Sequence, residues 1–356
     1  MTTIGAPNHG VMEGKGAYNR HATLQAGGIG LALSRLERAA NDLEPGSDSN
    51  PVVIADYGSS QGKNSLVPMR AAIAQLRSRL DPERAVFVFH VDQPSNDFNT
   101  LFEVLDADAN RYTLGQTNVF PCAIGRSFYE QVLPANSVHL GWASYAAVWL
   151  SRIPGPITGH FVALYSTGAE RGAFERQAAR DWEAFLALRA TELRRGGRLV
   201  VVLPGAKEDG VNGLEGLMDH ANAALAEMVE EHAIRAEERG RMAIGAFPRR
   251  ECELLAPFRG QGEFKGLEIE CCELFLHPDP AWADYERDGN EEALATKQSR
   301  FFRATFAPSL ACGLKDATVE TSSVFAGQLE KVLQRRLARQ PLPVHSFVQI
   351  MVFAKA

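Results

Sequence analysis

The chain has 356 residues, of which 45% are hydrophobic and 22% are charged, and its formal net charge is −6. This composition is ordinary for a globular protein with one large domain or two domains. Lysine and arginine form no stripe of the kind that phosphate contacts require, so we expect no nucleic-acid partner. No apolar run reaches the length of about 18 residues that a membrane span needs, so we expect no membrane partner.

The cysteines and the first residues bear on the cell compartment. The first ten residues are polar and lack the apolar stretch of a signal peptide. The cysteines lack the spacings of metal sites, and their odd number does not fit a disulfide framework. They are Cys122, Cys252, Cys271, Cys272 and Cys312. We therefore expect a reduced, cytoplasmic protein that holds no metal.

The first half of the chain alternates between helical and strand-like patterns. Residues 1–15 are rich in glycine, and we expect them to be flexible. Helices are expected from Tyr18 to about Leu43, over 66–80 and over 96–105, and short apolar strands over 51–55, 86–91, 118–124, 136–141 and 197–203. Strands that alternate with helices indicate βαβ units. The sequence therefore predicts an α/β fold with a mostly parallel sheet and helices on both faces.

This alternation stops after about residue 205. An amphipathic helix is expected over 213–229, and acidic stretches that contain proline follow it. We expect much of 206–310 to form a mostly helical cap inserted near the end of the sheet. A strand over 266–275, a helix over 318–338 and a last strand over 345–353 are expected to return to the core sheet.

Candidate ligand-binding residues follow the expected strands. Asp56, Gly58, Asp92 and Ser127 fall at or just beyond strand C-termini, which form the edge where ligands bind in such sheets. The turn between Asp56 and Asn64 has neither the GxxxxGK[ST] nor the GxGxxG pattern, which disfavours a nucleoside triphosphate or a dinucleotide. An acid before a tight glycine turn suits an ammonium group, such as that in the methionine part of S-adenosylmethionine. An ordinary turn between a strand and a helix explains the segment equally well.

Asp92 narrows the choice of ligand. A carboxylate at this strand end can accept hydrogen bonds from both hydroxyls of a ribose. Asp92 could instead cap the following helix, but Ser95 or Asn96 is available for that role. The ribose interpretation is therefore the more economical one.

Four blocks of sequence carry a resemblance that spans nearly the whole chain. They lie at 12–25, 54–64, 92–102 and 127–151. Through these blocks the chain resembles the SABATH family of methyltransferases. Members of that family methylate the carboxyl groups of salicylate, benzoate, jasmonate or indole-acetate, or the nitrogens of caffeine precursors. The resemblance implies a Rossmann-like methyltransferase sheet, S-adenosylmethionine as the cofactor, a small carboxylic acid as the substrate and a homodimer.

The alternation of strands and helices predicts a division of the chain, and the resemblance adds the lid and a set of cofactor contacts. Residues 16–205 would form the cofactor-binding core with an N-terminal lid, 206–310 the cap over the active site, and 311–356 the return to the core sheet. Ala22 stands where several relatives have a serine that contacts the cofactor, so one hydrogen bond should be missing. The implied contacts are Tyr18 in the lid, Asp56, Gly58 and Asn64 at the methionine end, Asp92 and Gln93 at the ribose, and Ser127 and Phe128 beside the adenine.

Gln25 and Trp149 match the pair that holds the acceptor carboxylate in the carboxyl-methylating members. A carboxylate only accepts hydrogen bonds, whereas the Trp Nε1–H and the Gln amide NH₂ donate them. Taken alone, Trp149 would be a core aromatic residue on a helix and Gln25 an exposed helix residue. Their joint placement favours the site.

The remaining pocket candidates predict an apolar pocket. Met218 stands where salicylate-type members carry a tryptophan, and Trp142 where many carry a histidine, so the size of the substrate ring stays open. An aromatic or a medium-chain acid fits such a pocket. The candidates are Trp142, Tyr145, Val148, Leu217, Met218, Phe302 and Phe347.

The predicted chemistry needs no general base. A carboxylic acid with a pKa of about 4–5 is already ionised at neutral pH. We expect His139, which lies within a strand, to be structural. The alternatives are an N-methyltransferase of a purine-like heterocycle, a non-catalytic protein that binds the cofactor and senses an acid, and a nicotinamide dehydrogenase. The retained Gln25 and Trp149 disfavour the first of these, and the missing glycine fingerprint disfavours the last.

Overall fold

The computed structural model describes residues 23–44, 46, 50–166 and 168–356. The strands are β1 (Val52–Tyr57), β2 (Val86–Asp92), β3 (Val119–Gly125), β4 (Val138–Ser144), β5 (Leu193–Ala206), β6 (Arg249–Arg250), β7 (Glu263–Phe264), β8 (Leu267–His277) and β9 (Ser346–Lys355). Within the described residues they form one nine-stranded sheet of order β3-β2-β1-β4-β5-β9-β8-β7, in which β6 pairs with β5. β1 to β5 pair in parallel, whereas β9, β8 and β7 run antiparallel to their neighbours.

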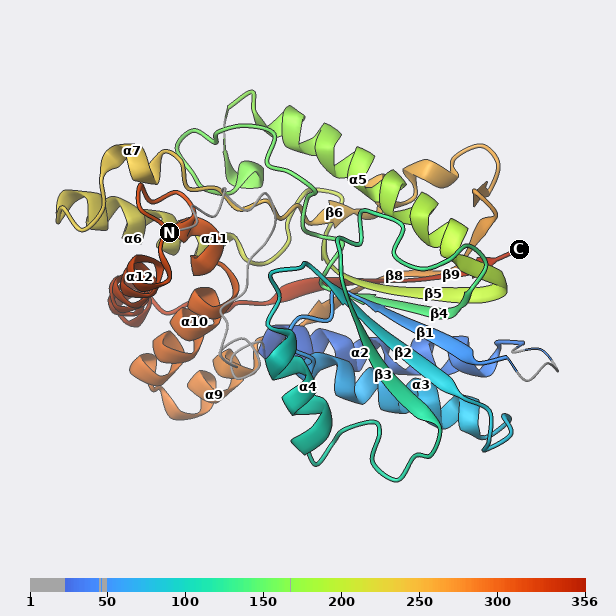
Figure 1. The fold of residues 1–356 in the computed structure, drawn as a ribbon. Helices are drawn as coiled ribbons and strands as arrows, with labels where there is room; N and C mark the ends of the chain where they lie inside the picture. Colours follow the sequence, from blue (N-terminus) through green and yellow to red (C-terminus); the bar gives the residue numbers. More distant parts are fainter. Residues whose placement is uncertain (1–22, 45, 47–49, 167) are drawn as a thin grey trace.

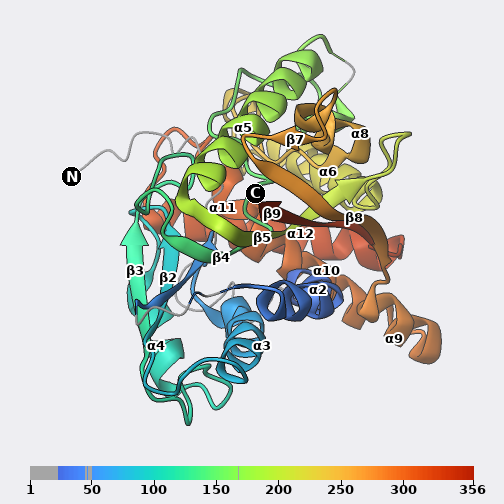
Figure 2. The ribbon, with the colours of Figure 1, turned by 90° about the vertical axis from the view of Figure 1, so that its right-hand side faces the viewer.

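Helices cover both faces of this sheet (Figures 1 and 2). On one face lie α2 (Thr23–Asn41), α3 (Leu66–Arg77) and α4 (Phe98–Ala107), and on the other lies α5 (Arg171–Glu192). The central strands are buried on both faces, which is why the chain shows nearly unbroken apolar runs there. The predicted α/β class is therefore confirmed, as are the seven predicted strands, each within a few residues of its expected bounds.

The sequence pattern gave no indication of α5. Trp182 and Phe185 pack against the sheet, but charged residues interrupt the apolar spacing of this helix. Arg189 and Glu192 form an ion pair that is fully buried on the same side. A charged pair on the buried face removes the amphipathic signal by which a helix is recognised.

A helical layer lies beside the sheet, at the left of Figure 1. Its helices are α6 (Glu215–Glu230), α7 (Ala236–Arg239), α9 (Pro280–Asp288), α10 (Glu291–Thr305), α11 (Ala307–Ala311) and α12 (Val319–Arg339), while the short α8 (Glu251–Leu254) packs near α5 and β9. α6, α10, α11 and α12 share one apolar core. No helix in the described part of the chain is long and apolar enough to cross a membrane.

Two predictions about this region have different outcomes. The helix expected over 318–338 exists as α12, but its expected return to the sheet is wrong, because its apolar face packs against α6 and α10. The strands expected over 266–275 and 345–353 do return, as β8 and β9. The division of the chain at residues 205 and 310 stays a prediction.

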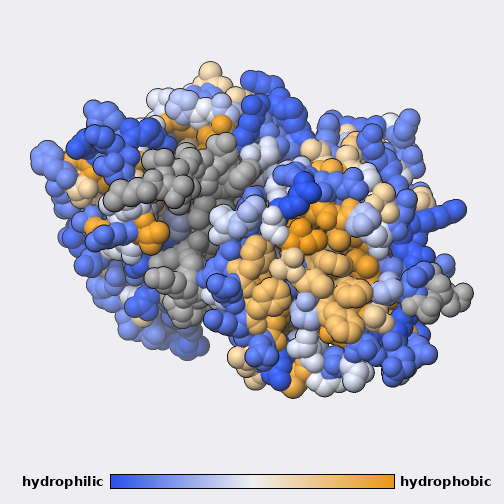
Figure 3. All heavy atoms as spheres, in the orientation of Figure 1, coloured by the Kyte–Doolittle hydropathy of each residue, from blue (hydrophilic) through white to orange (hydrophobic). Residues whose placement is uncertain are grey.

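One region of the sheet is open on the α5 side. Phe87 on β2 lies between Phe89 and Phe120, with ring centroids 6.1 and 5.4 Å apart. Phe120 on the edge strand β3 is 44% exposed. Figure 3 shows an apolar area over β1 to β3 at this position.

Candidate active site

The turn after β1 is shaped around Gly58. This residue has φ +87°, and a Cβ atom here would lie 2.3 Å from the Cβ of Ala146. Its N–H donates to the carbonyl of Val91 over 2.8 Å, which ties the turn to the end of β2. Only glycine meets both the positive φ and the close approach of the loop after β4.

Asp92 fixes the next residues of this turn. Its Oδ2 accepts a hydrogen bond from the Ser60 N–H over 2.6 Å, and its Oδ1 accepts one from the Gln93 N–H over 2.7 Å. Asn96 donates from Nδ2 to the Ser60 carbonyl over 2.7 Å. Burial raises the pKa of Asp92 to about 6, although the two backbone hydrogen bonds act in the opposite direction. Each carboxylate oxygen keeps a second lone pair with which it can accept a ligand hydroxyl.

Asp56 has its own buried partners. The Ser65 hydroxyl donates to its Oδ2 over 2.5 Å, and His90 Nδ1 lies 2.9 Å from the same atom. His90 Nε2 lies 2.8 Å from the Tyr112 hydroxyl, so the chain of polar contacts continues into the core. This network orients Asp56 below the turn. A contact with a ligand ammonium group stays a prediction.

A smaller cavity opens above this turn, between α2 and the ends of β1 and β4. It contains two of the predicted cofactor residues, Gly58 and Asn64. The hydroxyl oxygens of Ser59 and Ser144 are buried and lack a partner within the described residues, so the cavity fits a ligand with polar groups. Its lining is Gln25, Ile29, Gly58, Ser59, Ser60, Asn64, Ser65, Trp142, Ser144 and Tyr145.

The remaining cofactor candidates lie outside this cavity. Asp92 and Gln93 lie at the end of β2, beside the turn. Ser127 accepts a hydrogen bond from the Tyr129 N–H over 3.2 Å, and Phe128 is 9% exposed and packs edge-on against Phe185. Tyr18 and Ala22 lie outside the described residues.

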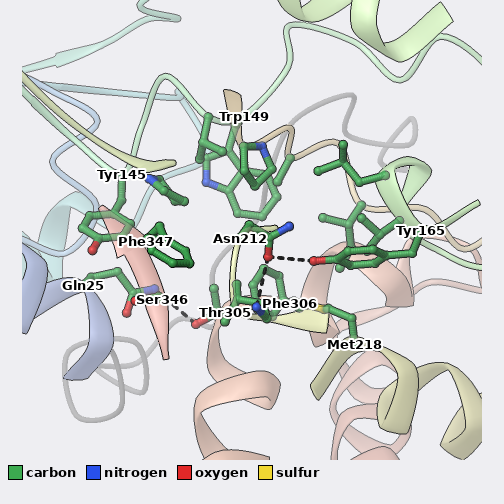
Figure 4. A pocket seen from close by; sticks show the side chains of 18 of the residues that line it. Gln25, Tyr145, Trp149, Tyr165, Asn212, Met218, Thr305, Phe306, Ser346 and Phe347 are labelled. Carbon is green, nitrogen blue, oxygen red and sulfur yellow. Dashed lines mark hydrogen bonds between the residues drawn. The ribbon is translucent and has the colours of Figure 1, made fainter. Parts of the chain in front are cut away.

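A larger pocket lies between the sheet and the helical layer (Figure 4). It encloses about 800 Å³ of empty space, open solvent included, and its walls come from the loop after β4, the segment between β5 and α6, α10 and the start of β9. Six predicted residues line it. They are Gln25, Tyr145, Val148, Trp149, Met218 and Phe347.

Three predicted residues do not line the larger pocket. Trp142 borders the smaller cavity instead, because it precedes the turn of the chain at Tyr145. Leu217 is fully buried in the helical layer, since neighbouring positions of α6 point in different directions and Met218 takes the pocket side. Phe302 packs behind the wall, with its ring 6.0 Å from that of Phe161 and 5.3 Å from that of Phe306.

Most of the polar residues that line the larger pocket were not predicted from the sequence. These residues lie in a loop or at the ends of helices and strands, where no periodic pattern marks them. They are Tyr165 at the end of a short 3-10 turn, Asn212 in the β5–α6 loop, Thr305 at the end of α10, and Ser346 at the start of β9.

Gln25 and Tyr145 border both the smaller cavity and the larger pocket. Gln25 is 5% exposed, not exposed as its helical position alone suggested, and its Nε2 lies 3.5 Å from the Thr305 hydroxyl. Tyr145 has φ +56°, which turns its side chain out of the strand direction. These two residues mark the junction of the two spaces.

Trp149 lies on the loop after β4 and not on a helix. Its backbone carbonyl accepts a hydrogen bond from the Tyr129 hydroxyl over 2.6 Å, and its backbone forms a bridge with Ala246. Its ring centroid is 6.4 Å from that of Phe306. Within the described residues its indole N–H makes no hydrogen bond, so this donor is available to a ligand.

The described lining of the larger pocket carries no aspartate, glutamate, histidine, lysine, arginine or cysteine. His139 lies in β4, where its Nδ1 accepts from the Val53 N–H over 3.1 Å and its Nε2 lies 2.7 Å from Arg194. These contacts agree with the structural role predicted for His139. The described part of the lining therefore offers hydrogen-bond donors and no side chain that titrates as a base near neutral pH.

A mostly parallel sheet with a glycine turn after its first strand, and a polar cavity joined to an apolar pocket, is the arrangement of Rossmann-like methyltransferases. The structure is similar to a solved structure described as loganic acid methyltransferase with SAH, with a TM-score of 0.78 and 22% identity. The similarity covers 97% of this chain and 99% of that one, and it shows that the two share a fold.

Residues 7–352 match the family described as SAM dependent carboxyl methyltransferase, and the chain belongs to this family. This confirms the SABATH family predicted from the sequence, with S-adenosylmethionine as the family's cofactor. Methyltransferase FUS9 of Gibberella moniliformis is 34% identical over 64% of this chain and 61% of its own length. The chain thus spans about three fifths of that relative. A benzoic acid/salicylic acid carboxyl methyltransferase of Petunia hybrida is 27% identical over 83% of this chain and 85% of its own length.

Proposed function

We propose that the protein transfers a methyl group from S-adenosylmethionine to the carboxylate of a small, largely apolar acid. The products are the methyl ester and S-adenosylhomocysteine. The observation that carries this proposal is the junction at Gln25 and Tyr145, which border both the polar cavity and the apolar pocket. A group held in one space meets a group held in the other at this junction.

The smaller cavity and the adjoining strand ends would hold the cofactor. Ser59, Ser144 and Asn64 supply polar atoms beside the glycine turn. Asp92 can accept from ribose hydroxyls while it keeps its two backbone hydrogen bonds. We further propose the predicted roles of Asp56 at the ammonium group, of Gln93 at the ribose, and of Ser127 and Phe128 beside the adenine. When bound, S-adenosylmethionine supplies a methyl group on a positively charged sulfur, which is electrophilic without activation.

Gln25 and Trp149 would orient the acceptor carboxylate. Both carry hydrogen-bond donors, and both line the larger pocket. The Gln25 amide can turn over so that Thr305 donates to its oxygen and its NH₂ faces the substrate. Holding the reacting carboxylate oxygen in line with the bond between the sulfur and the methyl group can lower the activation free energy by about 7–11 kcal/mol. No base is needed because the acid is already ionised.

A screen of carboxylic acids with labelled S-adenosylmethionine tests this function. The panel includes benzoate, salicylate, medium-chain acids and xanthine, and the label should appear in a base-labile methyl ester of one or more acids. Labelled xanthine with no ester would favour N-methylation instead. Acid binding by calorimetry without any ester would favour the non-catalytic acid sensor.

We also infer that the protein is a homodimer in the cytoplasm. The family resemblance supports the dimer, and the open apolar face at Phe87, Phe89 and Phe120 offers a surface for it. The five free thiols suit a reducing compartment. Light scattering at micromolar concentration should give twice the chain mass. Phe120→Asp should weaken the dimer. Val319→Asp, at a 79% exposed position on α12, is the control and should leave the dimer intact. A monomeric wild-type protein would refute the dimer, and cell fractionation tests the compartment.

A further inference from the structure

The larger pocket contains a second polar position, Asn212, apart from Gln25. Figure 4 shows Gln25 at one side of the pocket and Tyr165 at the other, with Asn212 between them. Asn212 is 2% exposed, and its Oδ1 accepts hydrogen bonds from the Tyr165 hydroxyl over 2.8 Å and from the Leu214 N–H over 3.0 Å.

The backbone holds Asn212 rigidly. Its N–H donates to Glu215 over 2.6 Å, and its carbonyl accepts from the Phe347 N–H over 3.2 Å. The next residue, Gly213, has φ +86°, and a Cβ there would lie 1.7 Å from the His345 carbonyl oxygen. The loop therefore cannot shift without breaking its contacts with β9.

These contacts determine which amide atom faces the pocket. A backbone N–H only donates, so the amide atom that Leu214 contacts must be the oxygen. The other amide atom is therefore the nitrogen, a donor. Asn212 Nδ2 is buried and has no partner within the described residues, although the residue lines the pocket. A buried donor without an acceptor is unfavourable, so a ligand acceptor would be favoured here.

The charge of the lining limits what that acceptor can be. The described lining has no charged side chain, and a second carboxylate would be buried there without a cation. A neutral oxygen needs no counter-charge. Leu164, Ile244 and Phe306 also line the pocket, so much of the wall that Asn212 shares is apolar.

We propose that Asn212 Nδ2 donates a hydrogen bond to a neutral oxygen of the substrate, at a point remote from the carboxylate that is methylated. This inference rests on the proposed function. The Asn212 contact predicts that the substrates are acids with an apolar middle and with a carbonyl, hydroxyl or ether oxygen toward the end opposite the methylated carboxylate. Plain alkanoic acids would bind but would leave Asn212 unpaired.

Matched pairs of acids test the proposal. Within each pair, a carbonyl oxygen in one acid is replaced by a methyl group in the other, and successive pairs move this group farther from the carboxylate. The readouts are kcat/KM for ester formation and the dissociation constant in the presence of S-adenosylhomocysteine. At one spacing, the oxo acid should be preferred by about 10-fold or more.

Asn212→Asp is the informative variant. An aspartate keeps the oxygen that Leu214 and Tyr165 contact, but it replaces the free donor with an oxygen. In this variant, the ratio of kcat/KM for the oxo acid to kcat/KM for its methyl-bearing partner should fall to about 1. The matched control is Asn222→Asp on α6, whose amide donates to the Gly159 carbonyl outside the pocket, and the preference should persist there.

Two results would overturn the proposal. One is a wild-type protein with no preference at any spacing, and the other is a preference that survives Asn212→Asp. The two readouts separate this proposal from the proposed function. Preferential binding without ester formation would retain the Asn212 contact and reject methyl transfer, whereas ester formation without preference would do the reverse.

Discussion

Gln25 Nε2 lies 3.5 Å from Thr305 Oγ1, although 280 residues separate them in the chain. Gln25 belongs to α2, which packs on the sheet, whereas Thr305 ends α10 in the helical layer. This contact joins the two layers at the point where the smaller cavity meets the larger pocket. The proposed acceptor site is therefore assembled by the approach of the helical layer to the sheet, and substitutions there should affect substrate positioning before stability.

Gln25→Ala and Trp149→Phe should each lower kcat/KM for the acid by about 10–100-fold, the effect expected for one lost hydrogen bond to a charged group. Trp149→Phe keeps most of the apolar volume, so its effect isolates the indole N–H. Steady-state kinetics with a good acid substrate measures both. The affinity for S-adenosylhomocysteine should hardly change in Trp149→Phe, because Trp149 lines the larger pocket and is not among the described residues that line the smaller cavity.

The control for these substitutions is Phe301, which lines the same pocket without a polar group. Phe301→Leu should raise KM modestly and leave the hydrogen bonds to the carboxylate intact. If Gln25→Ala and Trp149→Phe cost no more than Phe301→Leu, the two residues do not orient the carboxylate.

Cofactor affinity should depend on pH through Asp92. Burial raises the pKa of Asp92 to about 6, and a protonated carboxyl accepts hydrogen bonds less well than a carboxylate. Ribose hydroxyls therefore favour the ionised form. The affinity for S-adenosylhomocysteine should be maximal and independent of pH above about pH 7, and it should fall by up to about 10-fold per pH unit below about pH 6. Titration calorimetry from pH 5 to 8 measures this.

The variant Asp92→Asn should remove that pH dependence. An uncharged amide cannot accept from both backbone N–H groups and two hydroxyls, so affinity at pH 7.5 should fall by about 10–150-fold. Asp106→Asn, on the exposed side of α4, should leave the affinity and its pH profile unchanged. A wild-type affinity that is flat from pH 5 to 8 would argue against the ribose role.

The buried pair of Arg189 and Glu192 should be essential for stability. The Glu192 carboxylate also accepts from the Tyr57 hydroxyl over 2.7 Å and from the Val132 and Leu133 N–H groups over 2.6 and 3.1 Å. Glu192→Ala would leave Arg189 as an uncompensated buried charge, at a cost of about 3–5 kcal/mol in the free energy of unfolding. Urea denaturation measures the cost.

An exposed ion pair on the same side of the sheet provides the comparison. Arg126 pairs with Glu130, and both side chains are more than half exposed. Arg126→Ala should cost less than about 1 kcal/mol. Equal costs for Glu192→Ala and Arg126→Ala would show that the buried network contributes little.

The sheet could be predicted from the sequence because its strands are buried on both faces and appear as short apolar runs such as 199–203. The placement of α12 could not. Its amphipathic pattern shows that one face is buried, but the pattern does not say whether a sheet or another helix covers that face. α5 escaped prediction because a buried ion pair takes the place of apolar residues.

The residues of the candidate site also differ in whether they could be predicted from the sequence. Gly58 could be placed because it follows a buried strand of the predicted sheet, whereas Asn64, Gln25 and Trp149 were placed through the sequence blocks that resemble the family. Asn212, Thr305 and Ser346 come from three separate segments that meet only in the folded chain. Leu217 and Phe302 were predicted as pocket residues because sequence position alone does not show which side of a helix faces a cavity.

At a saturating concentration of cofactor, kcat/KM for the acid should be flat from about pH 6.5 to 9. The proposed nucleophile is a carboxylate whose pKa of about 4–5 lies well below this range. The described lining of the larger pocket holds no histidine, carboxylate or lysine that could act as a base. His139→Gln should lower stability, because His139 accepts from the Val53 N–H inside the sheet, and it should not alter the shape of the profile. A rate that rises tenfold per pH unit between 6 and 8 would mean that a proton must leave before transfer. The acceptor would then be a hydroxyl or a ring nitrogen, and carboxyl methylation would be the wrong reaction for this protein.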